Sequence, residues 1–171
     1  MPSTITVKLT PAGRWFVSIL VDDYTIKPLP KSDKSIGLDV GITSLIATSN
    51  GDKITNPKHF KKLRKKLKRT QKALARKQKG SNNRKKARVQ VAKVYAEIAD
   101  ARKDFLHKLT TQIIRENQTI VVEDLAIKNM MKNHKLALAI SDASWGELIR
   151  QLSLQVRVVW ARAYKNRPLV S

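Results

Sequence analysis

"SIGLDVGI", residues 35–42, and "TIVVEDL", residues 119–125, are the two stretches that decide the fold. Both runs are rich in β-branched residues, which is typical of buried strands, and each carries a carboxylate near its end, Asp39 or Glu123. An ionised carboxylate is costly to bury unless it is paired, hydrogen-bonded or bound to a metal. If the two strands are neighbours in one sheet, the two acids lie close together and repel each other unless a cation lies between them.

This pair of acids raises the hypothesis of a metal-dependent nuclease site. Mg²⁺ prefers oxygen ligands, often one or two carboxylates together with substrate phosphate oxygens. Paired metals assist phosphodiester hydrolysis by clamping the attacking and leaving oxygens. Asp39 and Glu123 are therefore candidate metal ligands. The same pattern also fits two strand-end acids that face solvent, and spacing alone does not separate these alternatives.

The composition favours a nucleic-acid partner. The chain has 171 residues, which suits one domain or one domain with an appendage, and 42% of them are hydrophobic, enough to form a core. Its 35 Lys and Arg against 13 Asp and Glu give a net charge of +22, which favours a polyanionic partner. No run is long and apolar enough to span a membrane and no signal-peptide layout is present, so a cytoplasmic protein is expected. With no cysteine, we expect no disulfide and no zinc in this chain.

A basic stripe runs from Lys58 to Arg88, where 16 of 31 residues are Lys or Arg, and no acid occurs between Asp52 and Glu97. Apolar residues at helical spacing, Phe60, Leu63, Leu67 and Leu74, predict a helix of about 33 Å from Lys58 to Lys79. "KGSNN" then breaks it, and Val91, Val94, Ile98, Phe105, Leu109 and Ile113 predict a second helix that folds back. The candidate nucleic-acid-binding residues of this helical hairpin, at about residues 57–116, are Lys61, Lys62, Arg64, Lys65, Lys66, Lys68, Arg69, Lys72, Arg76, Lys77, Arg84, Lys85 and Lys86.

Strand patterns surround the helical hairpin. Residues 1–21 predict a β-hairpin with its turn at Thr10 to Gly13, and a boundary is expected near Asp33. Three antiparallel strands follow between residues 35 and 56, and one more strand is expected after the helices, which together indicate an α+β fold with a mixed sheet. A last amphipathic helix is expected to begin at a Ser141 or Asp142 cap. Trp15, Trp145 and Trp160 fall in apolar patterns and are expected to pack in a core or in an interface.

Five stretches carry a family resemblance. They are "IGLDVGI", "KKLRKKLKRTQKALARKQKGSNNRKKA", "RKDFLHKLTTQIIREN", "TIVVEDL" and "SDASWGELIRQL". In this order, across about residues 35–152, the sequence resembles the OrfB/TnpB family of transposon-associated proteins, relatives of type V CRISPR effector nucleases. The resemblance implies a RuvC-like domain with an RNase H fold at residues 33–171, preceded at residues 1–32 by the closing strands of a β-barrel. It also implies an endonuclease that cuts DNA under the direction of a guide RNA, with Mg²⁺ or Mn²⁺ held by Asp39 and Glu123, while Asp124 points to the opposite face.

The sequence departs from the family pattern after about Leu154. The family continues with another strand, a four-cysteine zinc ribbon and a third catalytic Asp, and none of these follows "QVRVVWARAYKNRPLVS". We therefore expect a truncated form that holds its metal weakly and does not cut DNA by itself. The alternative hypothesis is a non-catalytic nucleic-acid-binding protein that retains the basic hairpin. A coiled-coil interaction protein ranks last, because it leaves the two acids and the charge without a role.

Overall fold

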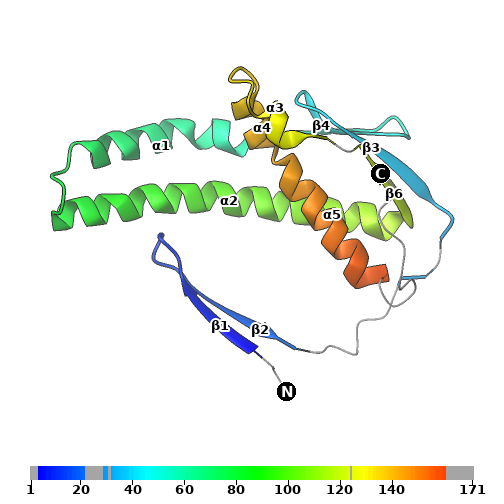
Figure 1. Ribbon diagram of the computed structural model, residues 1–171, viewed down its shortest axis with the longest axis horizontal. Coiled ribbons are helices and arrows are strands. Elements are labelled where there is room, and N and C mark those ends of the chain that lie inside the picture. Colours follow the sequence, from blue (N-terminus) through cyan, green and yellow to red (C-terminus); the bar gives the residue numbers. More distant parts are fainter. Residues whose placement is uncertain (1–3, 22–28, 31, 124, 161–171) are drawn as a thin grey trace. The chain divides into compact units, whose positions relative to one another are not determined.

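The computed structural model describes residues 4–21, 29–30, 32–123 and 125–160 (Figure 1). Contacts divide the described chain into two compact units. The first unit combines residues 1–26 with residues 59–101, and the second combines residues 27–58 with residues 102–171. Each unit is described separately below. The predicted division into residues 1–32 and 33–171 stays a prediction.

The second unit is built on a four-stranded mixed sheet with the order β5-β4-β3-β6. Its strands are β3 (Ser35–Val40), β4 (Ser44–Thr48), β5 (Lys53–Thr55) and β6 (Thr119–Val122). The first three pair antiparallel in chain order, whereas β6 lies parallel to β3. The predicted mixed sheet, with three antiparallel strands and a later strand added beside the first, is therefore confirmed.

Helices cover one face of this sheet and form the main core with it. In β3, Ile36, Leu38 and Val40 are buried while the residues between them are more exposed, so alternate side chains turn toward the core. The helical part of the core comes from the C-terminal part of α2 (Asn82–Glu116), from α4 (Ala137–Ala143) and from α5 (Trp145–Trp160). Their buried members are Leu106, Ile113, Ile114, Ile140, Ala143, Trp145, Leu148 and Leu152.

The predicted cap of the last helix was wrong. Ser141 and Asp142 lie inside α4, and the Asp142 carboxylate accepts a 2.9 Å hydrogen bond from Arg102 of α2. The helical conformation is interrupted at Ser144, which ends α4 and adopts a left-handed conformation with φ of 56°. The Ser144 carbonyl oxygen accepts hydrogen bonds from the N–H groups of Glu147 and Leu148, and α5 begins at Trp145. Two short helices, α3 (Ile127–Met130) and α4, precede this turn. The sequence pattern misplaced the start of α5 because it merged the residues of α4 with those of α5.

A buried polar contact joins α5 to α2. The Thr110 side chain is fully buried, and its hydroxyl donates to Gln151 Oε1 at 3.5 Å. The Gln151 amide donates in turn to the Glu147 carboxylate at 2.8 Å. Hydrogen bonds from Arg150 are the main reason that the pKa of Glu147 is lowered below its ordinary value. These contacts satisfy polar groups at the edge of an otherwise apolar helix interface.

The first unit contains the predicted β-hairpin, formed by β1 (Thr4–Leu9) and β2 (Trp15–Leu20). Gly13, with φ of 77°, closes the turn between them, and Ala12 in this turn is buried. Both strands are exposed on both faces, with Trp15 68% exposed, so Trp15 does not pack in a core of the described residues, and its packing in an interface stays a prediction. Trp145 does pack, whereas the Trp160 side chain lies outside the described part of the chain.

The basic helical hairpin is confirmed as α1 (His59–Ala75) followed by the N-terminal part of α2. A small core of Leu67, Val94 and Ile98, flanked by Phe60, Leu63 and Val91, joins the two helices. With 17 residues, α1 is about 26 Å long, shorter than predicted, because the chain leaves the helix after Ala75 and turns through Gly80 at φ of 85°. Among the described residues, no helix is long and apolar enough to cross a membrane.

The core of the second unit predicts a clear difference between two leucines of α5. Leu148 is 0% exposed, so Leu148→Ala should lower the free energy of unfolding by about 2–5 kcal/mol through lost burial and a residual cavity. Leu154 lies on the same helix and is 46% exposed, so Leu154→Ala should change it by less than about 0.5 kcal/mol. Urea unfolding followed by circular dichroism measures both values. Equal losses in the two variants would contradict this core.

Candidate functional site

Asp39 and Glu123 are brought together by the pairing of β3 with β6. The two strands run parallel, with Gly37 opposite Val121 and Leu38 opposite Val122. The paired residues end there, and Glu123 directly follows β6, so a continuation of the register by one position would set Glu123 beside Asp39. Neighbouring strands lie about 4.8 Å apart. Because the strands are parallel, both acids lie at the same edge of the sheet, at the carboxyl ends of the two strands.

The two acids also share one face of the sheet. Leu38 and Val40 on either side of Asp39 are buried in the main core, whereas Asp39 is exposed. Val122 packs against the same core, and Glu123 after it is exposed. Since successive side chains of a strand point to opposite faces, the Asp39 carboxylate extends from the face opposite the core, and Glu123, directly after β6, is likewise exposed.

Local backbone contacts hold this part of β3 in place. The Gly37 N–H donates to Ser49 Oγ at 3.0 Å, and the Gly37 carbonyl accepts the Ser49 N–H at 2.9 Å. At Gly41, a Cβ atom would lie only 3.0 Å from the Ser44 carbonyl oxygen, which favours glycine in the tight connection after Asp39. These contacts fix the strand on which Asp39 stands.

The donor set at this edge fits a hard divalent cation. Within the described residues, no group of three or more His, Cys, Asp or Glu side chains is placed to hold a metal ion. Two neighbouring carboxylates remain, and Mg²⁺ in phosphate-handling sites is often held by one or two carboxylates together with phosphate oxygens and waters. Asp39 and Glu123 are suited to hold such an ion. The prediction that Asp124 points to the opposite face concerns a residue that the structure does not describe.

The predicted nucleic-acid-binding residues all lie in the helical hairpin of the first unit. Arg76 and Lys77 directly follow α1, and Arg84, Lys85 and Lys86 lie near the start of α2. The others lie on α1 and are exposed: Lys61, Lys62, Arg64, Lys65, Lys66, Lys68, Arg69 and Lys72. The apolar seam occupies one side of α1, so a continuous cationic surface covers the rest of this helix.

Two of these cations are used inside the hairpin. Lys66 donates to the Glu97 carboxylate of α2 at 2.6 Å. Arg84 donates to the carbonyl oxygens of Leu74 and Lys77 at 3.2 and 3.0 Å, where it satisfies acceptors at the end of α1. In the sequence, Lys66 and Arg84 look the same as the neighbouring basic residues. Only the packing of α1 on α2 shows that these two side chains make contacts within the protein.

Sequence reasoning missed two further features. Tyr95 is 48% exposed on α2, and its hydroxyl accepts a 3.0 Å hydrogen bond from the Gln71 amide of α1. In the second unit, Arg102 and Asp142 form an ion pair in which the side chains are only 22% and 9% exposed. The signal for Tyr95 was present, because it is an aromatic residue beside an apolar seam position in a strongly basic segment.

Comparisons with known proteins identify relatives of this chain. The OrfB IS605 family model, described as "Probable transposase", matches residues 17–134. A protein of Streptomyces pristinaespiralis named "Putative RNA-guided DNA endonuclease" is 54% identical over 159 residues, covering 93% of this chain and 39% of that protein. A protein of Escherichia coli K12 named "Putative RNA-guided DNA endonuclease InsQ" is 34% identical over 156 residues, covering 82% of this chain and 39% of that protein.

The matched regions include both parts of the site. The family match spans Asp39, the basic helical hairpin and Glu123. The chain spans about two fifths of the length of the two relatives, 39% in each case. A family model that matches most of the chain, together with these relatives, is sufficient to assign the family. The chain belongs to the OrfB/TnpB family of transposon-associated proteins.

Proposed function

We propose that this chain forms part of an RNA-guided, metal-dependent DNA endonuclease. In this proposal, Asp39 and Glu123 hold a divalent cation, and the basic surface of α1 and the start of α2 binds nucleic acid. The observation that carries the proposal is the parallel register of β3 and β6, which ends at Leu38 opposite Val122, directly before the exposed Asp39 and Glu123. The names of the two relatives support guide RNA and DNA as partners.

The strand arrangement supports a RuvC-like domain of the RNase H fold. Three antiparallel strands are followed by a long helical segment and a fourth strand that lies parallel to the first. Carboxylates at the ends of neighbouring strands are suited to hold Mg²⁺ or Mn²⁺. When bound there, such an ion supplies positive charge against the negative charge that develops on the phosphate oxygens.

A non-catalytic nucleic-acid-binding protein is the second candidate. It is favoured by one observation, that the described residues gather two carboxylates and no larger group of metal-binding side chains. Two cations about 4 Å apart need more fixed oxygen ligands than two carboxylates provide. The two candidates share the nucleic-acid surface and differ in whether the bound metal supports turnover.

Metal binding should depend on both acids. Asp39→Asn and Glu123→Gln should each weaken Mn²⁺ binding by about tenfold or more, since loss of even a supporting ligand contact costs 10–100-fold at metal sites. Electron paramagnetic resonance of free Mn²⁺ measures the affinity. Asp52→Asn, in the β4–β5 turn, is the matched control because Asp52 is exposed on the same sheet but remote from the β3–β6 edge. Wild-type affinity in both site variants would refute the metal site.

The chain as given should bind metal without cutting DNA, since two carboxylates hold one cation and the chemistry calls for a clamped pair. The purified chain is incubated with Mg²⁺ or Mn²⁺ and with single-stranded, duplex or RNA-paired DNA, and products are resolved on denaturing gels. Asp39→Ala is the control for contaminating nucleases. Cleavage that disappears in Asp39→Ala would overturn this prediction and favour the nuclease over the non-catalytic candidate.

The solvent face of α1 should determine the salt dependence of duplex binding. Lys65, Arg69 and Lys72 lie away from the apolar seam, so the triple change to Gln should lower the slope of log affinity against log salt by up to about 2.7, or 0.9 per phosphate contact. Lys66 is left intact because it pairs with Glu97.

A charge-matched control removes three exposed cations of the second unit, Lys34, Lys53 and Lys135, by the same change to Gln. Filter-binding titrations at several salt concentrations give both slopes. The control should retain most of the wild-type slope. If it flattens the slope as much as the α1 variant does, binding follows net charge and the assigned surface is wrong.

A further inference from the structure

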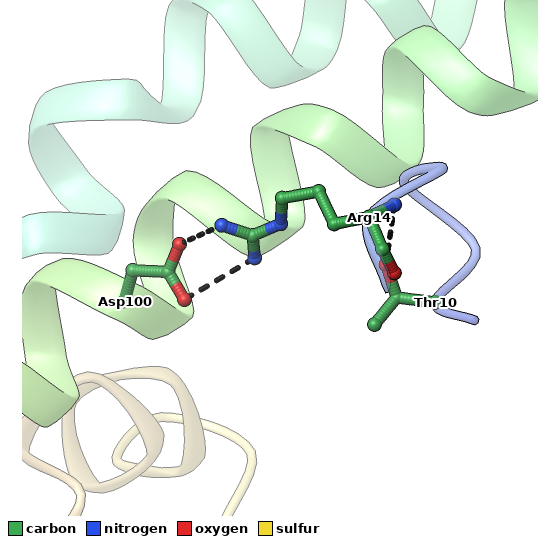
Figure 2. Close-up of polar contacts among 3 residues, drawn as sticks. All are labelled: Thr10, Arg14 and Asp100. Atoms are coloured by element: carbon green, nitrogen blue, oxygen red, sulfur yellow. Dashed lines mark hydrogen bonds and ion pairs between the residues drawn. The ribbon is translucent and has the colours of Figure 1, made fainter. Parts of the chain in front are cut away.

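The helical hairpin has two flanks, one on each side of its apolar seam, and they differ in their polar contacts. The first flank carries the acids of α2 that belong to the first unit. Glu97 pairs with Lys66 of α1 at 2.6 Å. Asp100 lies three residues further along the same side of α2. Its carboxylate accepts hydrogen bonds from both terminal nitrogens of Arg14, at 2.5 and 3.3 Å (Figure 2).

This first flank is therefore occupied by contacts within the protein. Arg14 belongs to the β1–β2 turn, where its N–H also donates to the Thr10 hydroxyl, and the hydrogen bond to Asp100 raises the pKa of its guanidinium (Figure 2). The ion pairs join α1 to α2 and the β-hairpin turn to α2. Their acids reduce the attraction of this flank for a polyanion.

The second flank carries cations and an exposed aromatic ring. Tyr95 is 48% exposed, and its hydroxyl is held at 3.0 Å by Gln71 of α1. Arg64 and Lys68 lie seven and three residues before Gln71, which puts them on the same side of α1. Arg88, seven residues before Tyr95, lies on the same side of α2 as the ring.

Two features keep this second flank open to a ligand. Ala92 lies three residues before Tyr95 and Ala99 four residues after it, so both are neighbours of Tyr95 on the surface of α2. Their side chains are too small to cover the ring. The described residues provide no ion-pair partner for Arg64, Lys68 or Arg88. The acids of α2 in this unit, Glu97 and Asp100, lie on the first flank.

We propose that the second flank, formed by Arg64, Lys68, Gln71, Arg88 and Tyr95, binds single-stranded nucleic acid. The Tyr95 ring stacks on an unpaired base, and the three cations contact the phosphates on either side of it. The inference rests on the proposed function, in which the hairpin binds nucleic acid, and adds the strandedness of the ligand. Stacking requires an accessible base face, which a paired and stacked duplex does not offer.

The position of Tyr95 favours stacking over a packing role. All aromatic residues of α1 and α2 are described, and the other two, Phe60 and Phe105, pack against the apolar cores. Tyr95 is 48% exposed, and its hydrogen bond with Gln71 involves the hydroxyl at the end of the ring rather than the ring itself. A ring held in one orientation loses little conformational entropy when a base stacks on it.

The test uses a short single-stranded DNA with one 2-aminopurine, whose fluorescence falls when the base is stacked, and the duplex of the same length. Tyr95→Leu should weaken single-strand binding by about tenfold and remove most of the protein-induced quenching, within the range known for base–aromatic stacking. Tyr95→Phe keeps the ring and should retain most of both. Duplex affinity should change by less than about twofold in either variant. Equal single-strand affinity and quenching in Tyr95→Leu and wild type would overturn the proposal.

A second comparison does not require any change to Tyr95. Lys68→Gln removes a cation of the second flank, whereas Lys62→Gln removes one that lies four residues before Lys66, on the first flank of the same helix. Single-strand affinity should fall more in Lys68→Gln, with circular dichroism confirming that both variants fold. Equal losses would contradict the flank assignment.

The outcomes separate this inference from the proposed function. If the wild-type chain binds neither single strands nor duplex, the nucleic-acid role of the hairpin fails and this inference fails with it. If the wild-type chain binds both, but neither Tyr95→Leu nor Lys68→Gln is selective for single strands, only the stacking site is wrong. Single-stranded RNA of the same sequence, run in parallel, shows whether the flank distinguishes the two sugars.

Discussion

The in-register parallel pairing of β3 with β6 is the constraint on which the candidate catalytic edge depends. The alternation that buries Leu38 and Val40 also exposes Asp39, and the same alternation in β6 exposes Glu123. A slip of one residue would move Val122 out of the core and turn Glu123 toward the opposite face. Because hydrophobic burial penalises that slip, the core supports the register on which the proposed pairing of the two acids depends.

The helix α2 contributes residues both to the core behind β3 and β6 and to the proposed nucleic-acid-binding hairpin. Its 35 residues contribute Val94 and Ile98 to the small core of the first unit and Leu106 and Ile113 to the main core of the second. A helix of this length gains most of its stability from such packing rather than from intrinsic propensity. Substitutions in either core therefore affect the stability of the same helix. Its exposed positions take no part in these cores and can carry charged side chains.

Much of the fold could be predicted from the sequence, because its elements have strong local patterns. β-branched runs, turn residues and the seam of Leu63, Leu67 and Val94 predict strands and helices directly. The start of the last helix could not be predicted, since the left-handed turn at Ser144 and the burial of Asp142 against Arg102 are tertiary effects. The exposure of Trp15 could not be predicted either, because an apolar alternating strand has the same pattern whether or not its faces are covered.

The candidate site was predictable in part for the same reason. Asp39 and Glu123 each interrupt an apolar run, which singles them out, but their proximity depends on which strands pair. For the basic surface, the sequence marks the cations without showing which of them the protein uses internally. Lys66 and Arg84 are distinguished from Lys65 and Lys85 only by what α2 and the end of α1 place next to them.

The ion pairs of the described residues leave the two candidate metal ligands unpaired. With 35 Lys and Arg in the chain, several acids take a basic partner, namely Glu97, Asp100, Asp104, Asp142 and Glu147. Asp39 and Glu123 have no such partner among the described residues. An isolated exposed acid needs no partner, but two acids on neighbouring strands repel each other. In a chain so rich in Lys and Arg, two acids left without a basic partner on neighbouring strands support the proposal that a cation from solution relieves their repulsion.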